Sequence, residues 1–453
     1  MSYNLSYYSS KYSQKTSYVE NFVAWSPFPP APLARITRST YTAKRLRNAV
    51  VHLVNGLITA YRTAFTGIPR QVWLLAGGLL INRAGTMVLP FLSLYLTRDL
   101  GLTPARAGFV IGSFGLGAMA GSFIGGWLSD RLDPVRVQLL SLTGTGIGFL
   151  VFTRIQNLGA LTVAVFVLST ISEAFRPALM AAVAHRSSPG IRARAFALIR
   201  LAANMGMAIG PAAAGILAIY GYVWIFVGDA LTCWAAALML AVTLAGAPSQ
   251  GGPPDSSQEK EFIGSPWRDL PFCTFLLLLT VLAMAFFQVW STMPLYLRSV
   301  FEMSERSIGL LLALNALIIV FTEMMLIRAV ESRDRMRMVG VGAFLVCGGL
   351  ALLALGSSWA VAVLSMVILT TGEMLSMPIT NAVVAERAGT SSVGRYMGAY
   401  ALAFSTAFVI GPIVGTAVYQ HFGPRALWLG IGAVGSMLAL AFAALSRPLG
   451  SIR

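Results

Sequence analysis

Several ionisable side chains lie inside long apolar stretches of this 453-residue chain. Glu173 and Arg176 occur one helical turn apart in the segment SEAFRP, and Arg200 follows in the next apolar stretch. Charged groups are costly in apolar surroundings, so those that persist usually face a polar cavity or one another. A carboxylate there can pair with an arginine and take up a proton when that partner moves away. We expect Glu173 to pair with Arg176, Arg200 or both, as a proton-coupling site or as a permanent structural network.

Other apolar stretches carry further candidates for the same charge network. Glu373 is the second choice after Glu173 for proton exchange, whereas Asp229, near the outer end of its stretch, is expected to be hydrated and structural. An Asn-Arg pair, Asn82 and Arg83, interrupts the apolar run LLINRAGTMVLPFLSLYL. Arg83 either binds an anionic group of a substrate through its forked guanidinium or neutralises a carboxylate such as Glu173 or Asp229.

The cavity that these charges would face is expected to be apolar and adaptable, because methionine and aromatic side chains accept ligands of varied shape. The candidates for its wall are Asn82, Arg83, Met87, Asn204, Gln288 and Trp290. The three histidines and three cysteines show no metal-ligand spacing, so the sequence predicts neither a metal site nor a cofactor.

The composition excludes an ordinary soluble protein. Hydrophobic residues make up 56% of the chain and charged residues 11%, against about 25% charged in typical soluble domains. Apolar stretches recur near the roughly 20 residues that a helix needs to cross a bilayer. Many of the basic residues behind the net charge of +16 lie in the N-terminal tail and in short connections between apolar stretches. This distribution indicates membrane orientation with both termini in the cytosol rather than nucleic-acid binding.

Changes in composition divide the chain into six segments. A Ser/Tyr- and Pro-rich tail is followed by a basic segment with apolar residues at helical spacing, as in a helix lying on a membrane surface. Two apolar halves follow, separated by a polar linker rich in Pro and Gly. The predicted boundaries are 1–43 for the disordered tail, 44–70 for the interfacial segment, 71–246 for the first half, 247–270 for the cytosolic linker, 271–446 for the second half and 447–453 for a C-terminal tail.

An internal repeat relates the two halves at a constant offset of 201 residues. It joins Tyr95 to Tyr296, AHR at 184–186 to AER at 385–387, and the Gly-Pro pair at 210–211 to that at 411–412. The sequence thus predicts an all-α polytopic protein with 12 transmembrane helices in two six-helix pseudo-symmetric halves. Repeats of this kind place a substrate site between the halves, near the middle of the membrane. Arg83 has Met284 as its counterpart, so the shared architecture does not require it.

Two motifs resemble signatures of the major facilitator superfamily. GGWLSDRLDPVR at 125–136 resembles its loop signature, G-x-x-x-D-R/K-x-G-x-R/K-R/K, through Gly126, Asp130 and Arg131. The resemblance implies that Gly126 allows tight helix packing and that Asp130 is a gate residue, which latches one conformation by contacting a helix end of the other half. Asp133 replaces the later glycine of the signature.

The second motif, GMAIGPAAAG at 206–215, resembles the helix-5 signature associated with antiporters in that family. The matching residues are Gly206, Gly210, Pro211 and Gly215. Small residues allow close backbone approach, and proline frees a carbonyl group. The feature also suits simple close packing, because GPIVG at 411–415 repeats it in the second half.

The resemblance implies a secondary transporter that works by alternating access, as a monomer in a bacterial inner membrane, with protons and a small molecule as its partners. Proton-coupled export of small amphiphilic compounds is the first expectation. The alternatives are proton-coupled uptake of a small anionic metabolite, a non-transporting membrane sensor and an integral membrane enzyme. No enzyme activity is expected, because the sequence contains neither an H-E-x-x-H motif nor a Walker A motif.

Overall fold

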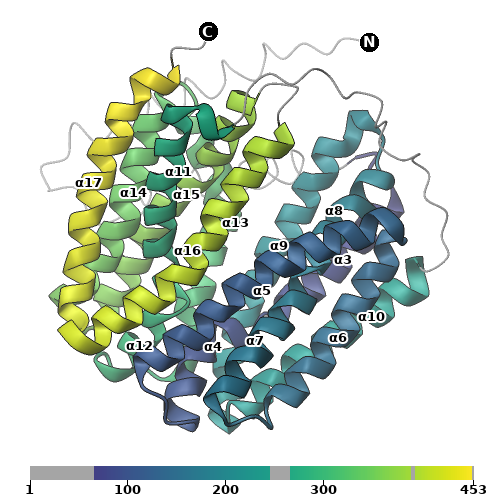
Figure 1. Ribbon diagram of the computed structural model, residues 1–453, viewed down its shortest axis with the longest axis horizontal. Coiled ribbons are helices and arrows are strands. Elements are labelled where there is room, and N and C mark those ends of the chain that lie inside the picture. The colour runs from purple at the N-terminus through teal and green to yellow at the C-terminus, as the bar shows by residue number, and fades with distance from the viewer. Residues whose placement is uncertain (1–65, 245–265, 389–392, 451–453) are drawn as a thin grey trace, which may run out of the picture. The chain divides into compact units, whose positions relative to one another are not determined.

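The computed structural model describes residues 66–244, 266–388 and 393–450. In these ranges twelve helical spans are long and apolar enough to cross a membrane, which confirms the predicted all-α polytopic fold. The predicted tail at 1–43, most of the interfacial segment and linker, and residues 451–453 lie outside the described residues. Figure 1 shows the first-half helices, coloured purple to teal, gathered on one side and the green to yellow second-half helices on the other.

Six spans form each half. The first half contains α3 (Arg70–Ala84), α4 (Val88–Leu94), the π-helical turn η1 (Tyr95–Asp99), α5 (Pro104–Arg131), α6 (Pro134–Phe152), α7 (Leu158–Glu173), α8 (Phe175–His185), α9 (Pro189–Leu217), the 3₁₀ turn η2 (Ala218–Tyr220) and α10 (Val223–Leu244). The second half contains the 3₁₀ turn η3 (Pro266–Arg268), α11 (Leu270–Phe286), η4 (Phe287–Val289), α12 (Thr292–Ser299), α13 (Glu305–Val330), α14 (Arg335–Leu352), η5 (Leu353–Leu355), α15 (Trp359–Ala388), α16 (Val393–Phe422) and α17 (Pro424–Gly450).

Polar caps fix where several of these helices begin. The side chain of Asp133 accepts hydrogen bonds from the backbone N–H groups of Val135 and Arg136 at the start of α6. Asn157 and Ser304 cap α7 and α13 in the same way. Such caps satisfy N–H groups that have no partner within the helix. These capping residues are a local signal in the sequence. They mark the helix starts in the short connections between long apolar runs.

The two ends of the helix bundle differ in charge. We call the end that holds the α5–α6, α8–α9 and α13–α14 connections the arginine-rich end, because Arg131, Arg186, Arg192, Arg328 and Arg333 lie there. The opposite end holds the η1–α5, α6–α7 and α12–α13 connections.

The first span of each half is interrupted at an equivalent place. The first span breaks between α3 and α4 at Gly85, Thr86 and Met87, and the seventh breaks at η4 before α12. Glycines of the two Gly-Pro repeats pack at these breaks: an added Cβ at Gly210 would lie 2.9 Å from the carbonyl oxygen of Thr86, and one at Gly411 would lie 3.2 Å from that of Met284. The 201-residue repeat is therefore a repeat of packing as well as of sequence.

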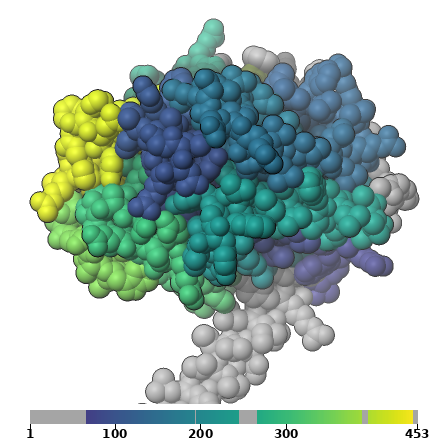
Figure 2. Space-filling model, turned by 90° about the horizontal axis from the view of Figure 1, so that it is seen from below, coloured from purple at the N-terminus to yellow at the C-terminus, as the bar shows by residue number. Residues whose placement is uncertain are grey.

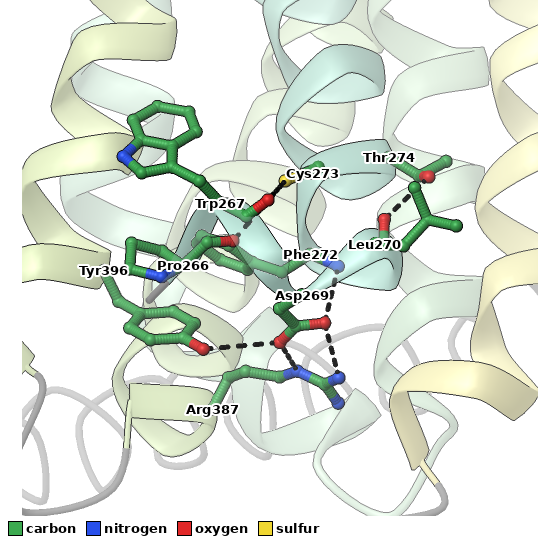
Figure 3. A network of polar contacts seen from close by, with 9 residues as sticks. All are labelled: Pro266, Trp267, Asp269, Leu270, Phe272, Cys273, Thr274, Arg387 and Tyr396. Atoms are coloured by element: carbon green, nitrogen blue, oxygen red, sulfur yellow. Dashed lines mark hydrogen bonds and ion pairs between the residues drawn. The ribbon is translucent and has the colours of Figure 1, made fainter. Parts of the chain in front are cut away.

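A polar network anchors the start of the second half at the arginine-rich end (Figure 3). The Asp269 carboxylate caps α11 and accepts two hydrogen bonds from Arg387 of α15, at 2.7 and 2.9 Å. The Tyr396 hydroxyl of α16 donates a third, at 3.4 Å. Burial alone would raise the pKa of Asp269, but these hydrogen bonds and the Arg387 charge together lower it. The network therefore ties three helices together through one charged carboxylate.

Candidate functional site

Glycines bring the two halves into backbone contact toward the opposite end. An added Cβ at Gly108 of α5 would lie 2.7 Å from the carbonyl oxygen of Pro412 in α16, and one at Gly309 of α13 would lie 2.2 Å from that of Pro211 in α9. Only residues without a side chain permit so close an approach of two helices. The contacts close the seam between the halves here, and Figure 2, viewed from this end, shows dark-blue atoms of the first half directly against yellow atoms of the second.

A polar clasp joins the halves at the same end. Glu305, the first residue of α13, pairs with Arg98 of the first half at 3.5 Å and with Arg298 of its own half at 3.2 Å. The Tyr222 hydroxyl of the first half donates a hydrogen bond to Glu305 at 3.1 Å. Burial first, and then the neighbouring Glu305 carboxylate, raise the pKa of Tyr222, so its hydroxyl keeps the proton that it donates.

A cavity of about 690 Å³ lies between the halves, within the size range of small-molecule sites. Lining residues nearest the opposite end, such as Phe152 and Phe226, are fully buried. Lining residues nearest the arginine-rich end, such as Ser122 of α5 and Ala401 of α16, are exposed. The cavity therefore opens toward the arginine-rich end and is closed toward the other.

Five of the residues predicted from the sequence line this cavity together. Asn82 and Arg83 end α3, Glu173 ends α7, Arg176 lies in the first turn of α8, and Asp229 lies in α10. All charged residues in the described lining belong to the first half. The second half contributes mainly aromatic and methionine side chains, among them Phe286, Phe287, Phe404, Phe408, Tyr400 and Met377.

The expected pairing of Glu173 with Arg200 is replaced by an ion pair across the halves. Arg200 of α9 contacts Glu323 of α13 at 2.9 Å. The two helices pack along one another and place these side chains at matching depth, so Arg200 reaches across the seam rather than toward α7. Among the described residues, neither Glu173 nor Arg176 takes part in an ion pair within 4.0 Å.

Glu373 does not line the cavity but lies beside this ion pair. The amide group of Asn315 in α13 donates hydrogen bonds to Glu373 at 2.8 Å and to Thr370 at 2.9 Å. Glu373 also interacts electrostatically with Glu323. Glu323 and Asn315 were not among the sequence candidates. Both are polar residues inside the apolar helix α13, and this polarity is the sequence signal by which they could have been predicted.

Asp229 is buried, with 4% of its surface exposed, instead of hydrated as expected. Its carboxylate accepts hydrogen bonds from the backbone N–H groups of Met87 and Val88, both at 3.3 Å, and so caps α4 after the break in the first span. A carboxylate at this position satisfies N–H groups that the break exposes. Gly430 is the repeat counterpart of Asp229, so the second half lacks this cap.

The remaining cavity predictions are not among the lining residues. Met87 is buried in the hydrophobic core, and Asn204 and Trp290 are half-buried outside the cavity. Gln288 is buried and supports the break in the seventh span: its amide group donates to the carbonyl oxygen of Gly411 at 2.8 Å, and its oxygen accepts from Thr292 at 2.6 Å. The amide of Gln288 is thus occupied by the protein itself.

The helix-5 motif has a packing role at every matched position. Added Cβ atoms at Gly206 and Gly210 would collide with the end of α3 and the break after it, and one at Gly215 would collide with the start of α13. Pro211 lies inside α9 without interrupting it, and its carbonyl oxygen faces Gly309. The motif therefore holds α9 against the first span and against the other half.

In the loop motif, Gly125 rather than Gly126 makes the tight contact. An added Cβ at Gly125 would lie 2.5 Å from the carbonyl oxygen of Ala174, whereas one at Gly126 would meet nothing within 4 Å. Arg131 stacks on the ring of Trp127 at 4.0 Å. Asp130 is exposed and forms no ion pair with any residue that the structure describes.

Substitution by alanine distinguishes these two glycines. Gly125→Ala is expected to lower the melting temperature in detergent, because overpacking a helix contact costs about 1–3 kcal/mol. Gly126→Ala is expected to leave it unchanged or raise it slightly, since alanine favours a helix over glycine by up to about 1 kcal/mol. Equal effects of the two substitutions would contradict the packing described here.

Known proteins resemble this chain in sequence and in fold. The sequence profile of the Major Facilitator Superfamily matches residues 74–407 of this chain. Two uncharacterized MFS-type transporters of Bacillus subtilis, YqjV and YttB, are 26% and 25% identical; the alignments cover 78% and 80% of this chain and 87% and 92% of those proteins. A crystal structure of a POT family transporter in complex with 5-aminolevulinic acid superposes with a TM-score of 0.73 at 14% identity, covering 85% of this chain and 98% of that one.

The match begins within α3 and ends within α16, so it includes every span except α17 in whole or in part. It includes the helices that line the cavity and those that form the closed seam. The chain belongs to the major facilitator superfamily of membrane transporters.

Proposed function

We propose that the protein is a secondary transporter that exports small amphiphilic compounds in exchange for protons. The observation that carries the proposal is the cavity between the halves, open toward one end and closed at the other by contacts between the two halves. Rocking of the halves would exchange the open and closed ends while leaving each six-helix half intact. The mixed lining of charged, aromatic and methionine side chains suits amphiphilic ligands.

In this proposal the protein acts as a monomer in a bacterial inner membrane, and the arginine-rich end faces the cytosol, as the positive-inside rule favours. Asp130 acts as a latch in the alternative state, in which the cytosolic ends of the halves meet. Asp130 is exposed and forms no ion pair with the described residues, which agrees with a released latch in a structure that is open at this end.

Glu173 is the first candidate for proton exchange, because it lines the cavity without an ion pair among the described residues. Glu373 is the second, because it lies beside the Arg200–Glu323 ion pair, which crosses the seam. Separation of the halves would break the Arg200–Glu323 pair. Glu323 and the neighbouring Glu373 would then hold two carboxylates without the arginine, which favours uptake of a proton by one of them.

Proteoliposomes with an imposed pH gradient test the proposal. The probes are naphthalene-2-sulfonate and trimethyl(2-naphthylmethyl)ammonium, whose permanent charges prevent passive redistribution with pH. Proton exchange predicts that an acidic lumen drives accumulation of at least one probe and that an alkaline lumen does not. Protein-free liposomes are the control, and the absence of gradient-driven flux for both probes would contradict the proposal.

The same assay tests the assignment of Glu173. Glu173→Gln is expected to lose accumulation driven by the pH gradient while keeping exchange of labelled for unlabelled probe, because the amide cannot carry the exchanged proton. Glu331→Gln, which changes an exposed carboxylate at the end of α13, is the matched control. Gradient-driven accumulation by Glu173→Gln equal to that of the control would rule out Glu173 as the proton site.

Proton-coupled uptake of a small anion is the second candidate, favoured by the two cavity arginines that have no described ion pair. An anion bound beside Glu173 binds more tightly when that carboxyl group carries a proton, so anion and proton would move in the same direction. Accumulation driven by an alkaline lumen would select this candidate over export.

A further inference from the structure

We propose that the transported compound is an organic anion with an aromatic body, held with its anionic group against the first half and its aromatic body against the second. This inference rests on the proposed transport through the cavity and adds the charge and orientation of the substrate. An anion bound beside Glu173 favours movement together with the proton, which is the second candidate above, over exchange. It follows from how the charged and aromatic side chains are divided between the two walls of the cavity.

The first-half wall offers two guanidinium groups, those of Arg83 and Arg176. The ion pairs of the described residues involve neither of them. Arg83 is half-buried at the end of α3, and Arg176 is exposed to the cavity mouth. A guanidinium group within a membrane protein is costly unless an anion or water satisfies it. Its planar fork binds carboxylate, sulfonate-like or phosphate oxygens through two parallel hydrogen bonds.

The carboxylates of the same wall are less accessible than its guanidinium groups. The buried carboxylate of Asp229 accepts hydrogen bonds from the backbone N–H groups of Met87 and Val88 and interacts electrostatically with Arg83. Arg176 is exposed, and among the described residues it forms no ion pair with Glu173. A ligand in the cavity therefore meets the guanidinium groups more readily than the Asp229 carboxylate, and a cationic ligand would meet repulsion from Arg83 and Arg176.

The second-half wall supplies the surface for an apolar body. Phe286 and Phe287 lie at the end of α11 and in η4, and Phe404 and Phe408 lie on α16. The ring centroids of Phe287 and Phe408 are 4.6 Å apart in an edge-to-face arrangement. No Asp, Glu, Lys or Arg of the described second half lines the cavity. Aromatic faces of this kind favour a flat apolar or aromatic group.

Binding to the purified full-length protein tests the charge preference. The probes again share a naphthalene ring and differ in the permanent charge of the attached group: naphthalene-2-sulfonate against trimethyl(2-naphthylmethyl)ammonium. The sulfonate is expected to bind with a Kd about tenfold or more below that of the ammonium compound, as measured by thermal stabilisation across a concentration series. Equal or tighter binding of the ammonium compound, or no binding of the sulfonate, would overturn the proposal.

Variants locate the anion. Arg176→Gln and Arg83→Gln are each expected to raise the Kd for the sulfonate about tenfold or more, the cost of losing a charged hydrogen bond. Arg83→Lys, which keeps the charge without the fork, is expected to lie in between. Arg154→Gln, at an exposed arginine of the opposite end, is the control. Because Arg176 is exposed, its variant keeps the test valid if Arg83→Gln fails to fold. Unchanged sulfonate binding in both cavity variants would overturn the proposal.

Failure of this inference differs from failure of the proposed function. Gradient-driven flux of the ammonium probe alone would support transport and overturn the anion preference. Selective sulfonate binding without flux of either probe would support the anion site and overturn transport.

Discussion

Gly309→Leu is expected to lower the transport rate about tenfold or more while the protein remains folded, because it blocks closure of the seam. An added Cβ at Gly309 would already lie 2.2 Å from the carbonyl oxygen of Pro211 in the other half. The larger side chain disfavours only the state in which α9 and α13 touch here. An overpacking cost of about 1–3 kcal/mol shifts a two-state equilibrium about 5- to 150-fold toward the state that is open at this end.

Gly348→Leu is the matched control for this prediction, since an added Cβ at Gly348 of α14 would meet nothing within 4 Å. Both variants add the same apolar volume to a membrane-length helix. Flux of naphthalene-2-sulfonate or of the ammonium probe in proteoliposomes gives the rate, and the melting temperature in detergent reports folding. A Gly309→Leu protein that transports as fast as Gly348→Leu would show that this contact does not open during transport.

Arg387→Met and its repeat counterpart Arg186→Met are expected to change stability in opposite directions. Removing Arg387 leaves the half-buried Asp269 carboxylate without its cationic partner, which costs about 1.5–3 kcal/mol for the lost charged hydrogen bonds. Arg186 is 3% exposed, and within the part of the chain that the structure describes none of its guanidinium nitrogens has a hydrogen-bond partner. Replacing it by an apolar side chain is expected to gain about 1–3 kcal/mol, the usual penalty of an unsatisfied buried group.

The difference arises because the repeat is incomplete. The counterpart of Asp269 at the offset of 201 is Ile68, so the first half lacks the carboxylate that Arg387 has. Burial lowers the pKa of Arg186, and Asp133 offsets this in part. Melting temperatures of the two variants in the same detergent provide the measurement. Destabilisation of similar size by both substitutions would contradict the assignment of Arg186 as unsatisfied.

The Asp269 pair also predicts a pH dependence. The pKa of Asp269 is lower in the folded protein than its ordinary value of 3.8. The stabilisation is therefore fully present above the ordinary pKa and is lost as the pH falls through the lower, folded-state value. The stability difference between wild type and Arg387→Met is expected to stay constant from neutral pH to about pH 5 and to shrink below pH 4. A difference that does not change with pH below 4 would contradict this account.

The sequence was sufficient for the fold because the decisive signals are local or periodic. Apolar length set the twelve spans, and caps such as Asp133 and Asn157 set several helix starts. The offset of 201 predicted equivalent halves, and the structure repeats the packing of the Gly-Pro pairs at 210–211 and 411–412. The breaks in the first and seventh spans were not predicted, since they depend on distant groups such as Asp229 that satisfy the exposed backbone.

The site was predicted in part, for a related reason. Asn82, Arg83, Glu173, Arg176 and Asp229 line one cavity because polarity inside an apolar helix usually means a cavity-facing position. Partners were harder to predict than positions. The pairing of Arg200 with Glu323 depends on the register between α9 and α13, which lie in different halves, and no sequence spacing encodes that register. The choice between Gly125 and Gly126 depends on the rotation of α5 against Ala174.

Access to the cavity from each face of the membrane tests alternating access most directly. In a protein whose Cys233, Cys273 and Cys347 are replaced, Ser405→Cys puts one thiol in the cavity wall, where a membrane-impermeant maleimide can report its exposure. Alternating access predicts labelling from the arginine-rich side and, more slowly, from the opposite side, with Gly309→Leu shifting labelling toward the opposite side. Labelling from the arginine-rich side alone, in both backgrounds, would contradict it.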